Sequence, residues 1–193
     1  MKIKTLLRSK LFVCAFFCAI FLSLFANAQD YVPATKPVFR GRSPGVKVKL
    51  LSDSVGSTKT YMLVFAPGDE ILSGLYEFAE KYKVKSAHFT AIGDTYSAKI
   101  GWFDRAKKMF RVNVINQQSE ITSMIGDIAI YNGKPVVHAH INLAAEDGTV
   151  RGGHLLEAFV APTLEIILTV EPATLYKKFN ADFGGALIDP TEK

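Results

Sequence analysis

The sequence predicts an α+β fold: a single compact domain with a mostly antiparallel sheet of about seven strands and one main helix near residues 69–82. One segment repeats apolar residues at helical spacing, several others alternate apolar and polar residues, and short turn sequences such as Asn132-Gly133 separate the alternating segments. Because short turns join neighbouring strands that run in opposite directions, the sheet is expected to be mainly antiparallel.

The first 28 residues resemble a secretory signal peptide. A basic start is followed by an apolar run, "LFVCAFFCAIFLSLF", and the small residues Ala26 and Ala28 precede the expected cleavage point. The run has about 15 residues, fewer than the roughly 20 that a helix needs to cross a bilayer. We therefore expect cleavage after Ala28 and export to the periplasm or the medium, with no stable membrane anchor afterwards. A short membrane anchor, or a lipid attached at Cys14 or Cys18, is the alternative.

Removal of this segment changes the charge and the cysteine content. It carries four of the 23 basic residues and none of the 18 acidic ones, so the other 165 of the 193 residues have 19 basic residues, 18 acidic residues and a formal charge of +1. Such a near-neutral domain lacks the positive charge typical of nucleic-acid binding. Both cysteines lie in the removed segment, which excludes disulfides and thiolate chemistry from the mature chain.

Residues 29–58 are rich in proline, glycine and small polar residues, so we expect a flexible lead-in whose first dozen residues are poorly ordered. A first strand is expected within it at 46–51, because "VKVKLL" alternates. The main domain is expected over residues 59–180, and residues 181–193 form a C-terminal tail.

The helix follows a strand and the turn sequence "PGDE". Its apolar residues recur at helical spacing and form one buried stripe. Asp69 is expected to cap the helix, with Glu70 favourable for the helix dipole. The residues of the stripe are Ile71, Leu72, Leu75, Phe78, Ala79 and Tyr82.

The rest of the chain is almost entirely β in pattern. Asn132-Gly133 and Asp147-Gly148 are strong signals for hairpin turns. The strands expected after the lead-in are 60–66, 84–93, 97–104, 109–115, 120–131, 135–144 and 163–172. A short helix is expected within "ATLYKKFNADFGGALIDPTEK" at the end of the chain.

Three of the four histidines lie between residues 138 and 154. In "VVHAHINLA" the alternation puts His138, His140 and Asn142 on one face of a strand. Same-face neighbours lie roughly 6–7 Å apart, so two imidazoles at this spacing can lean onto one metal ion.

The third histidine requires an argument about register. A two-residue turn at Asp147-Gly148 would pair His154 with Ile141, on the wrong face. One extra residue in the return strand moves His154 opposite Asn142, and Gly152-Gly153 is a sequence that accommodates a β-bulge. We therefore expect a bulge there that brings His154 to the face of His138 and His140.

Three imidazoles that leave one coordination position open are typical of catalytic rather than structural zinc sites. Imidazole also binds iron, nickel and copper, so the sequence predicts a divalent metal site, with zinc first. The alternative is a polar strand face whose histidines only contact water. His88, in the apolar strand "SAHFTAIG", is interpreted as a hydrogen-bonded core or interface histidine rather than a ligand.

Two long segments together resemble a known family. "PGDEILSGLYEFAEKYKVKSAHFTAIGDTYSAKIGWFD", followed by "HAHINLAAEDGTVRGGHLLEAFVAPTLEIIL", is similar to the PPC domain (plants and prokaryotes conserved), whose bacterial members are often described as PD1-like DNA-binding proteins. The resemblance covers roughly residues 59–178. It implies an α+β fold around an antiparallel sheet, a homotrimer, and a metal on His138, His140 and His154. Asp94 departs from the pattern, since the family usually has a small or neutral residue there.

Three functions are compatible with these features. We favour an exported homotrimeric binding protein whose small ligand is unknown. A metal-dependent hydrolase or lyase is the alternative, with Glu157, Glu165 or Asp94 as a base or a residue behind the ligands. A DNA-binding protein is disfavoured by export and by the near-neutral charge, and nucleic acid is not expected as a partner. The segment "FRGRSPG" (39–45) only superficially resembles an AT-hook, because Ser43 stands before the proline.

Overall fold

The computed structural model describes residues 29–34, 41–53 and 58–192. The expected signal peptide, the start of the AT-hook-like segment and most of the loop after the first expected strand lie outside the described residues. The chain divides after Asp30 into two units, and every helix and strand of the described residues belongs to the second unit. Among the described residues, no helix is both long and apolar enough to span a lipid bilayer.

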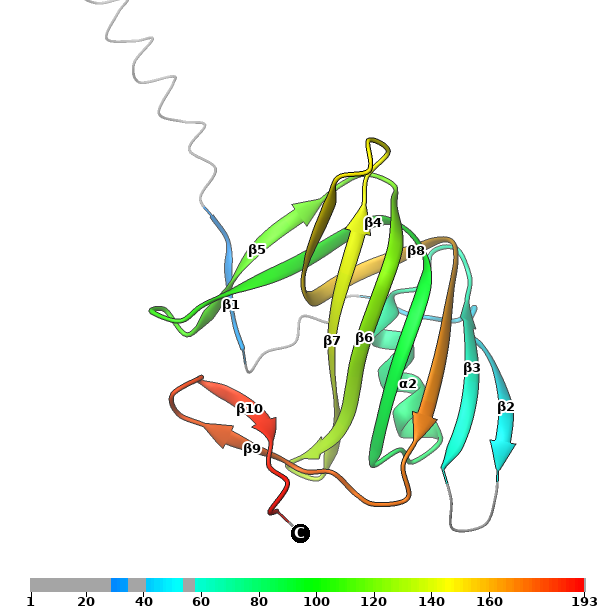
Figure 1. Ribbon diagram of the computed structural model, residues 1–193, viewed down its shortest axis with the longest axis vertical. Helices are drawn as coiled ribbons and strands as arrows, with labels where there is room; N and C mark the ends of the chain where they lie inside the picture. The colour runs from blue at the N-terminus through cyan, green and yellow to red at the C-terminus, as the bar shows by residue number, and fades with distance from the viewer. Residues whose placement is uncertain (1–28, 35–40, 54–57, 193) are drawn as a thin grey trace, which may run out of the picture. The chain divides into compact units, whose positions relative to one another are not determined.

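The α+β prediction is confirmed. Eight strands form one sheet in the order β1-β5-β4-β6-β7-β8-β3-β2, and β4 also pairs with β8 (Figure 1). Every strand pair in the sheet is antiparallel. The strands are β1 (Tyr31–Pro33), β2 (Lys47–Asp53), β3 (Lys59–Phe65), β4 (Ser86–Asp104), β5 (Met109–Ile115), β6 (Ser119–Tyr131), β7 (Lys134–Ala144) and β8 (Val150–Val170).

The long strands β4 and β8 curve the sheet, because each pairs with different strands along its two halves. The N-terminal half of β4 pairs with β6 and with the C-terminal half of β8, whereas its C-terminal half pairs with β5 and with the middle of β8. The two strands predicted at 84–93 and 97–104 are thus one strand, because register shifts around Thr95 bend the chain without interrupting its pairing. The strand predicted at 163–172 is the second half of β8.

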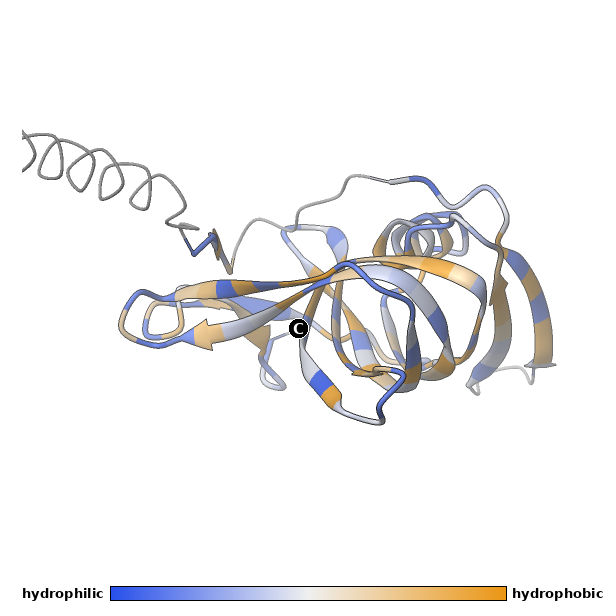
Figure 2. Ribbon diagram, turned by 90° about the horizontal axis from the view of Figure 1, so that it is seen from above, coloured by the Kyte–Doolittle hydropathy of each residue, from blue (hydrophilic) through white to orange (hydrophobic). Residues whose placement is uncertain are grey.

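The hydrophobic core lies between the sheet and α2 (Ile71–Lys81), which packs against β7 and β8 (Figure 1). Figure 2 shows the alternation of hydrophobic and hydrophilic residues along the strands. Leu63, Leu75 and Ile166 are fully buried. Burial of each such side chain contributes about 1.5–3 kcal/mol relative to its exposure. The predicted helical stripe is buried over Ile71–Ala79, while Tyr82 lies at the end of the helix and is partly exposed.

The helix cap differs from the prediction. Glu70, not Asp69, is the N-cap, and its carboxylate accepts hydrogen bonds from the backbone N–H groups of Leu72 and Ser73. Asp69 instead accepts hydrogen bonds from the N–H groups of Gly45 and Ala66. The turn before the helix is one residue longer than expected, because Asp69 is needed to hold the incoming chain.

This contact also gives the segment after residue 40 a structural role. Besides the bond from Gly45 to Asp69, the buried Ser43 hydroxyl donates to the backbone oxygen of Glu70, and the oxygen of Gly41 accepts a hydrogen bond from the Ser73 hydroxyl. The described part of the AT-hook-like segment is therefore packed on the start of α2 rather than extended as an arm.

The C-terminal segment forms a hairpin where a short helix was predicted. β9 (Lys177–Asn180) pairs with β10 (Gly185–Ile188) in a separate two-stranded sheet (Figure 1). The Asn180 side chain accepts a hydrogen bond from the N–H of Phe183, and Gly184 adopts a φ of 75°. A left-handed glycine in a tight turn stops a helix and reverses the chain.

Candidate metal centre

Strand β7 carries two of the three clustered histidines. Its residues alternate between core and surface: Val137, Ala139 and Ile141 are buried, whereas His138 and His140 point to the opposite face. The predicted alternation is confirmed. It arises because successive side chains of a strand point to opposite faces, and the apolar set is held in the core.

The third histidine reaches this face by a different route from the one predicted. Ala145 and Thr149 close a three-residue loop, and Gly148 at its end adopts a φ of 79°. This loop pairs His154 directly with His140, in a register without a bulge at Gly152-Gly153. The predicted bulge is therefore wrong, since the extra residue lies in the loop instead.

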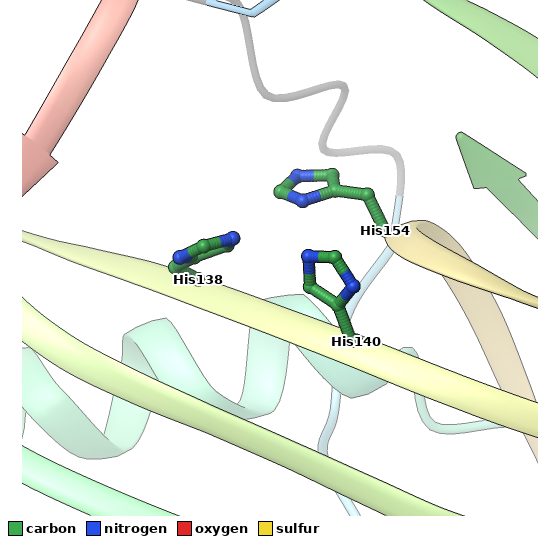
Figure 3. Close-up of side chains that lie close together, drawn as sticks. All are labelled: His138, His140 and His154. Carbon is green, nitrogen blue, oxygen red and sulfur yellow. The ribbon is translucent and has the colours of Figure 1, made fainter. Parts of the chain in front are cut away.

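The three rings converge, two from β7 and one from β8 (Figure 3). Each histidine offers one ring nitrogen, and these nitrogens all lie within 4.8 Å of one another. The ring centroids are 5.2 Å apart for His138 and His140, 5.1 Å for His138 and His154, and 5.5 Å for His140 and His154.

His154 is the most enclosed of the three. Its ring stacks on Phe110 with centroids 4.3 Å apart and planes inclined by 13°. Burial, followed by the nearby His138, His140 and Lys177, lowers the pKa of His154 to about 3. Burial and His138 also lower the pKa of His140, despite the opposing charge of Asp127. Both rings are therefore neutral near pH 7, which is the form that binds a metal ion.

A carboxylate not anticipated from the sequence holds His138. The Asp127 Oδ2 atom on β6 lies 3.3 Å from His138 Nδ1, and its Oδ1 atom lies 2.8 Å from Lys177 Nζ on β9. Burial raises the pKa of Asp127, but hydrogen bonds from His138 and Lys177 outweigh this and hold the pKa below its ordinary value. The Asn132-Gly133 turn could have revealed Asp127, because a two-residue turn there pairs Asp127 with His138. Nothing in the sequence pointed to Lys177.

The three carboxylates suggested from the sequence lie elsewhere. Glu157 is buried and pairs with Lys99 at 2.8 Å, because the two are register partners on β8 and β4, and directly opposed residues of an antiparallel pair share a face. Glu165 is exposed on β8, and Asp94 is half-buried opposite Glu120. His88 is exposed on β4, with its Nδ1 atom 3.3 Å from a Glu171 oxygen. Of the two positions expected for it, the core is therefore wrong, and an interface stays a prediction.

Two features of the cluster fit a metal ion: its three imidazole nitrogens, and one buried nitrogen that lacks a hydrogen-bond partner. The Nδ1 atom of His154 is buried and has no hydrogen-bond partner among the described residues. A buried polar atom without a partner is costly unless another group satisfies it. Nitrogens bound tetrahedrally at about 2.0–2.1 Å are roughly 3.3 Å apart. Small side-chain rotations would bring nitrogens within 4.8 Å to that spacing.

Comparison with known proteins is consistent with this fold. The family model of the Plants and Prokaryotes Conserved domain, abbreviated PCC or PPC, matches residues 52–171. No curated protein sequence matches the chain significantly.

Crystal structures of several proteins resemble the chain. A PPC protein of Pyrococcus horikoshii is 30% identical, with a TM-score of 0.65 and coverage of 76% of this chain and 97% of that one. A protein of Archaeoglobus fulgidus described as metal-containing is 27% identical, with a TM-score of 0.63 and coverage of 74% and 96%. A candidate DNA-binding protein of Bacteroides thetaiotaomicron has a TM-score of 0.70 and coverage of 75% and 97%, and at 21% identity it supports the fold alone.

Proposed function

The chain belongs to the Plants and Prokaryotes Conserved domain family, and from this premise we propose that it is an exported, homotrimeric binding protein that holds a divalent metal ion, zinc, on His138, His140 and His154. The convergence of the three histidine nitrogens within 4.8 Å carries the proposal. The metal-containing relative from Archaeoglobus fulgidus supports it. When bound, a metal on three imidazoles supplies a Lewis acid with a coordination position for one further ligand.

The contacts of the nearby carboxylates favour binding over catalysis. A hydrolase or lyase that activates water needs a general base near the metal. Asp127 contacts the cluster, but its two oxygens are engaged by His138 and Lys177. Glu157 is held by Lys99. These carboxylates therefore stabilise side chains, and neither is poised to accept a proton from a water molecule.

A small pocket beside the histidines supports a small ligand. It has a volume of about 90 Å³, and its polar side chains are those of Tyr76, His138, His154 and Lys177. A bound dication favours an anion, and the apolar wall favours a short hydrocarbon group, so we propose a short-chain carboxylate. The apolar wall includes Leu72, Phe110, Val137, Leu156, Phe183 and Leu187.

The ligand proposal is tested by calorimetric titration of the zinc-loaded protein with acetate, propionate and butyrate, and with the matching alcohols as controls. Binding of the carboxylates and not of the alcohols is expected. Equal or absent binding of both series would contradict the proposed ligand class.

Metal content tests the site itself. The protein is purified without an affinity tag, and its zinc is measured by elemental analysis. We expect close to one zinc per chain, a loss of that metal in the double variant His138→Ala/His140→Ala, and no change in His88→Ala, which removes an exposed histidine outside the cluster. Metal retained by the double variant would refute the site.

An exposed apolar face supports the homotrimer. Ile92, Ile125 and Ile167 are 63%, 60% and 48% exposed. Thr90 on β4 pairs with both Ile125 and Ile167, and Ile92 lies two residues further along β4, so the three side chains share one face. Contiguous exposed apolar groups mark an interaction surface, and we assign this one to other copies of the chain.

Light scattering tests the trimer. A mass of three chains is expected for the unaltered protein and a smaller mass for Ile125→Glu. Val114→Glu is the matched control, because Val114 is also a half-exposed strand residue but lies on β5. A monomeric mass for the unaltered protein, or a trimer that persists in Ile125→Glu, would contradict the assignment.

Export is tested by cell fractionation and N-terminal sequencing, with Gln29 expected as the first residue of the exported form. Intact chain that remains in the cytoplasm would contradict it. The formal charge of +1 expected after cleavage disfavours DNA as a partner.

A further inference from the structure

A buried lysine of the C-terminal hairpin is linked to the histidine cluster through a shared carboxylate. The Lys177 side chain is only 3% exposed, and its ammonium lies 2.8 Å from Asp127 Oδ1. The other oxygen of the same carboxylate lies 3.3 Å from His138 Nδ1. Lys177, Asp127 and His138 therefore form one chain of contacts across β9, β6 and β7.

The backbone places Lys177 beside this carboxylate. The N–H of Ile130 on β6 donates to the oxygen of Leu175 at 2.8 Å, and Ile130 and Tyr176 form a parallel bridge. These contacts dock the start of the hairpin on β6 three residues away from Asp127. Lys177 then follows directly, with its side chain turned inward while Lys178 is exposed.

A buried ammonium is costly unless it is paired, so its position beside Asp127 is well determined. A carboxylate held from one side by Lys177 accepts the Nδ1–H of His138 from the other. This contact selects the ring tautomer that carries its proton on Nδ1 and leaves Nε2 as the metal-binding atom.

On the basis of the proposed metal site, we propose that Lys177 is a positioning residue: it fixes the Asp127 carboxylate, which fixes the orientation and tautomer of His138. Lys177 lies beyond residues 52–171, the part of the chain that matches the family model. The C-terminal hairpin of this chain thus completes a site whose histidines all lie within the family domain.

Two measurements on the full chain test this role in Lys177→Met, which keeps the length of the side chain and removes the charge. The first is the ¹⁵N spectrum of the His138 ring in metal-free protein. It is expected to show the Nδ1–H tautomer in the unaltered protein and a mixture of tautomers in the variant. The second is zinc affinity by competition with a chromophoric chelator, which is expected to fall by about 10–100-fold in the variant.

Lys178→Met is the matched control, since Lys178 is the next residue of β9 and its side chain is 66% exposed. It should change neither measurement. A folded Lys177→Met protein that keeps the Nδ1–H tautomer and binds zinc within twofold of the unaltered protein would overturn the proposal. If the unaltered protein binds no zinc, the metal site fails, but the tautomer measurement still decides the role of Lys177.

The double variant Asp127→Asn/Lys177→Met covers the case in which Lys177→Met alone does not fold, because it leaves no unpaired buried carboxylate. If Lys177 acts through Asp127, the double variant binds zinc as tightly as Asp127→Asn alone. A further loss of more than about threefold would mean that Lys177 acts independently, against the proposal.

Discussion

The enclosure of His154 predicts that the metal-free protein loses stability in mild acid. The pKa of His154 is lowered to about 3 in the folded protein, whereas an unfolded chain has a histidine pKa of about 6.5. Between these two values the unfolded state binds one proton more than the folded state. The stabilisation is therefore complete above pH 6.5 and is lost as the pH falls towards 3.

The magnitude follows from the two pKa values. Each pH unit in this range is worth about 1.4 kcal/mol, so the loss between pH 7 and pH 5 is about 2 kcal/mol, and the whole range gives at most about 5 kcal/mol. The lowered pKa of His140 acts in the same direction. The lowered pKa of Asp127 adds a loss only at the lower pH at which carboxylates titrate.

Urea unfolding between pH 7.5 and pH 4.5, in the presence of a chelator, measures this dependence. His154→Phe removes the titrating ring but keeps a ring that can stack on Phe110. Between pH 7 and pH 5 the variant should therefore lose about 2 kcal/mol less stability than the unaltered protein. His88→Ala, which changes an exposed histidine, should follow the unaltered protein. Parallel profiles for the unaltered protein and His154→Phe would refute the role of His154 burial.

Three further predictions concern the same site. Zinc at 100 times its dissociation constant should stabilise the unaltered protein by about 2.7 kcal/mol, seen as a higher melting temperature that a chelator reverses, and this shift should be absent in His140→Ala. Phe110→Ala removes a buried ring and should lower the free energy of unfolding in urea by about 3–5 kcal/mol. NMR titration of this variant should show the pKa of His154 raised towards 6.5, because water reaches the His154 ring once Phe110 no longer covers it. Gly126→Ala would direct a methyl group into the Phe89 ring and the backbone oxygen of His138, and should cost about 1–3 kcal/mol in the same assay.

Local patterns in the sequence were sufficient for the main helix, for most of the strands and for the face of β7. The stripe that begins at Ile71 gave the helix, and alternation around His138 and His140 gave their shared face, because both are consequences of which residues the core buries. The helix cap was misassigned by one residue, since aspartate is a preferred N-cap residue and glutamate is not. Only the contact of Asp69 with Gly45, which is distant in the sequence, distinguishes Asp69 from Glu70.

The C-terminal hairpin and the burial of Lys177 could not be predicted from local sequence patterns. The hairpin buries little of its own surface, so its strands have no clear alternation, and its position depends on backbone bonds to Ile130 on β6. A lysine is normally exposed, and Lys178 beside it is. Lys177 can be buried only because it pairs with the Asp127 carboxylate on β6. A single sequence does not show that these two distant residues are in contact.

The placement of His154 shows that the face to which a strand residue points can be predicted even when its pairing partner is not. A bulge at Gly152-Gly153 and a third residue in the loop both shift the pairing of β8 by one residue, and either shift turns His154 to the face of His140. The structure uses the loop, and so His154 faces His140 rather than Asn142. On its other side His154 pairs with Gly101 of β4, which fixes the same orientation independently of the loop. The cluster is thus determined by strand pairing on both sides of β8, and this is the physical reason to expect that the three histidines remain together when no metal is bound.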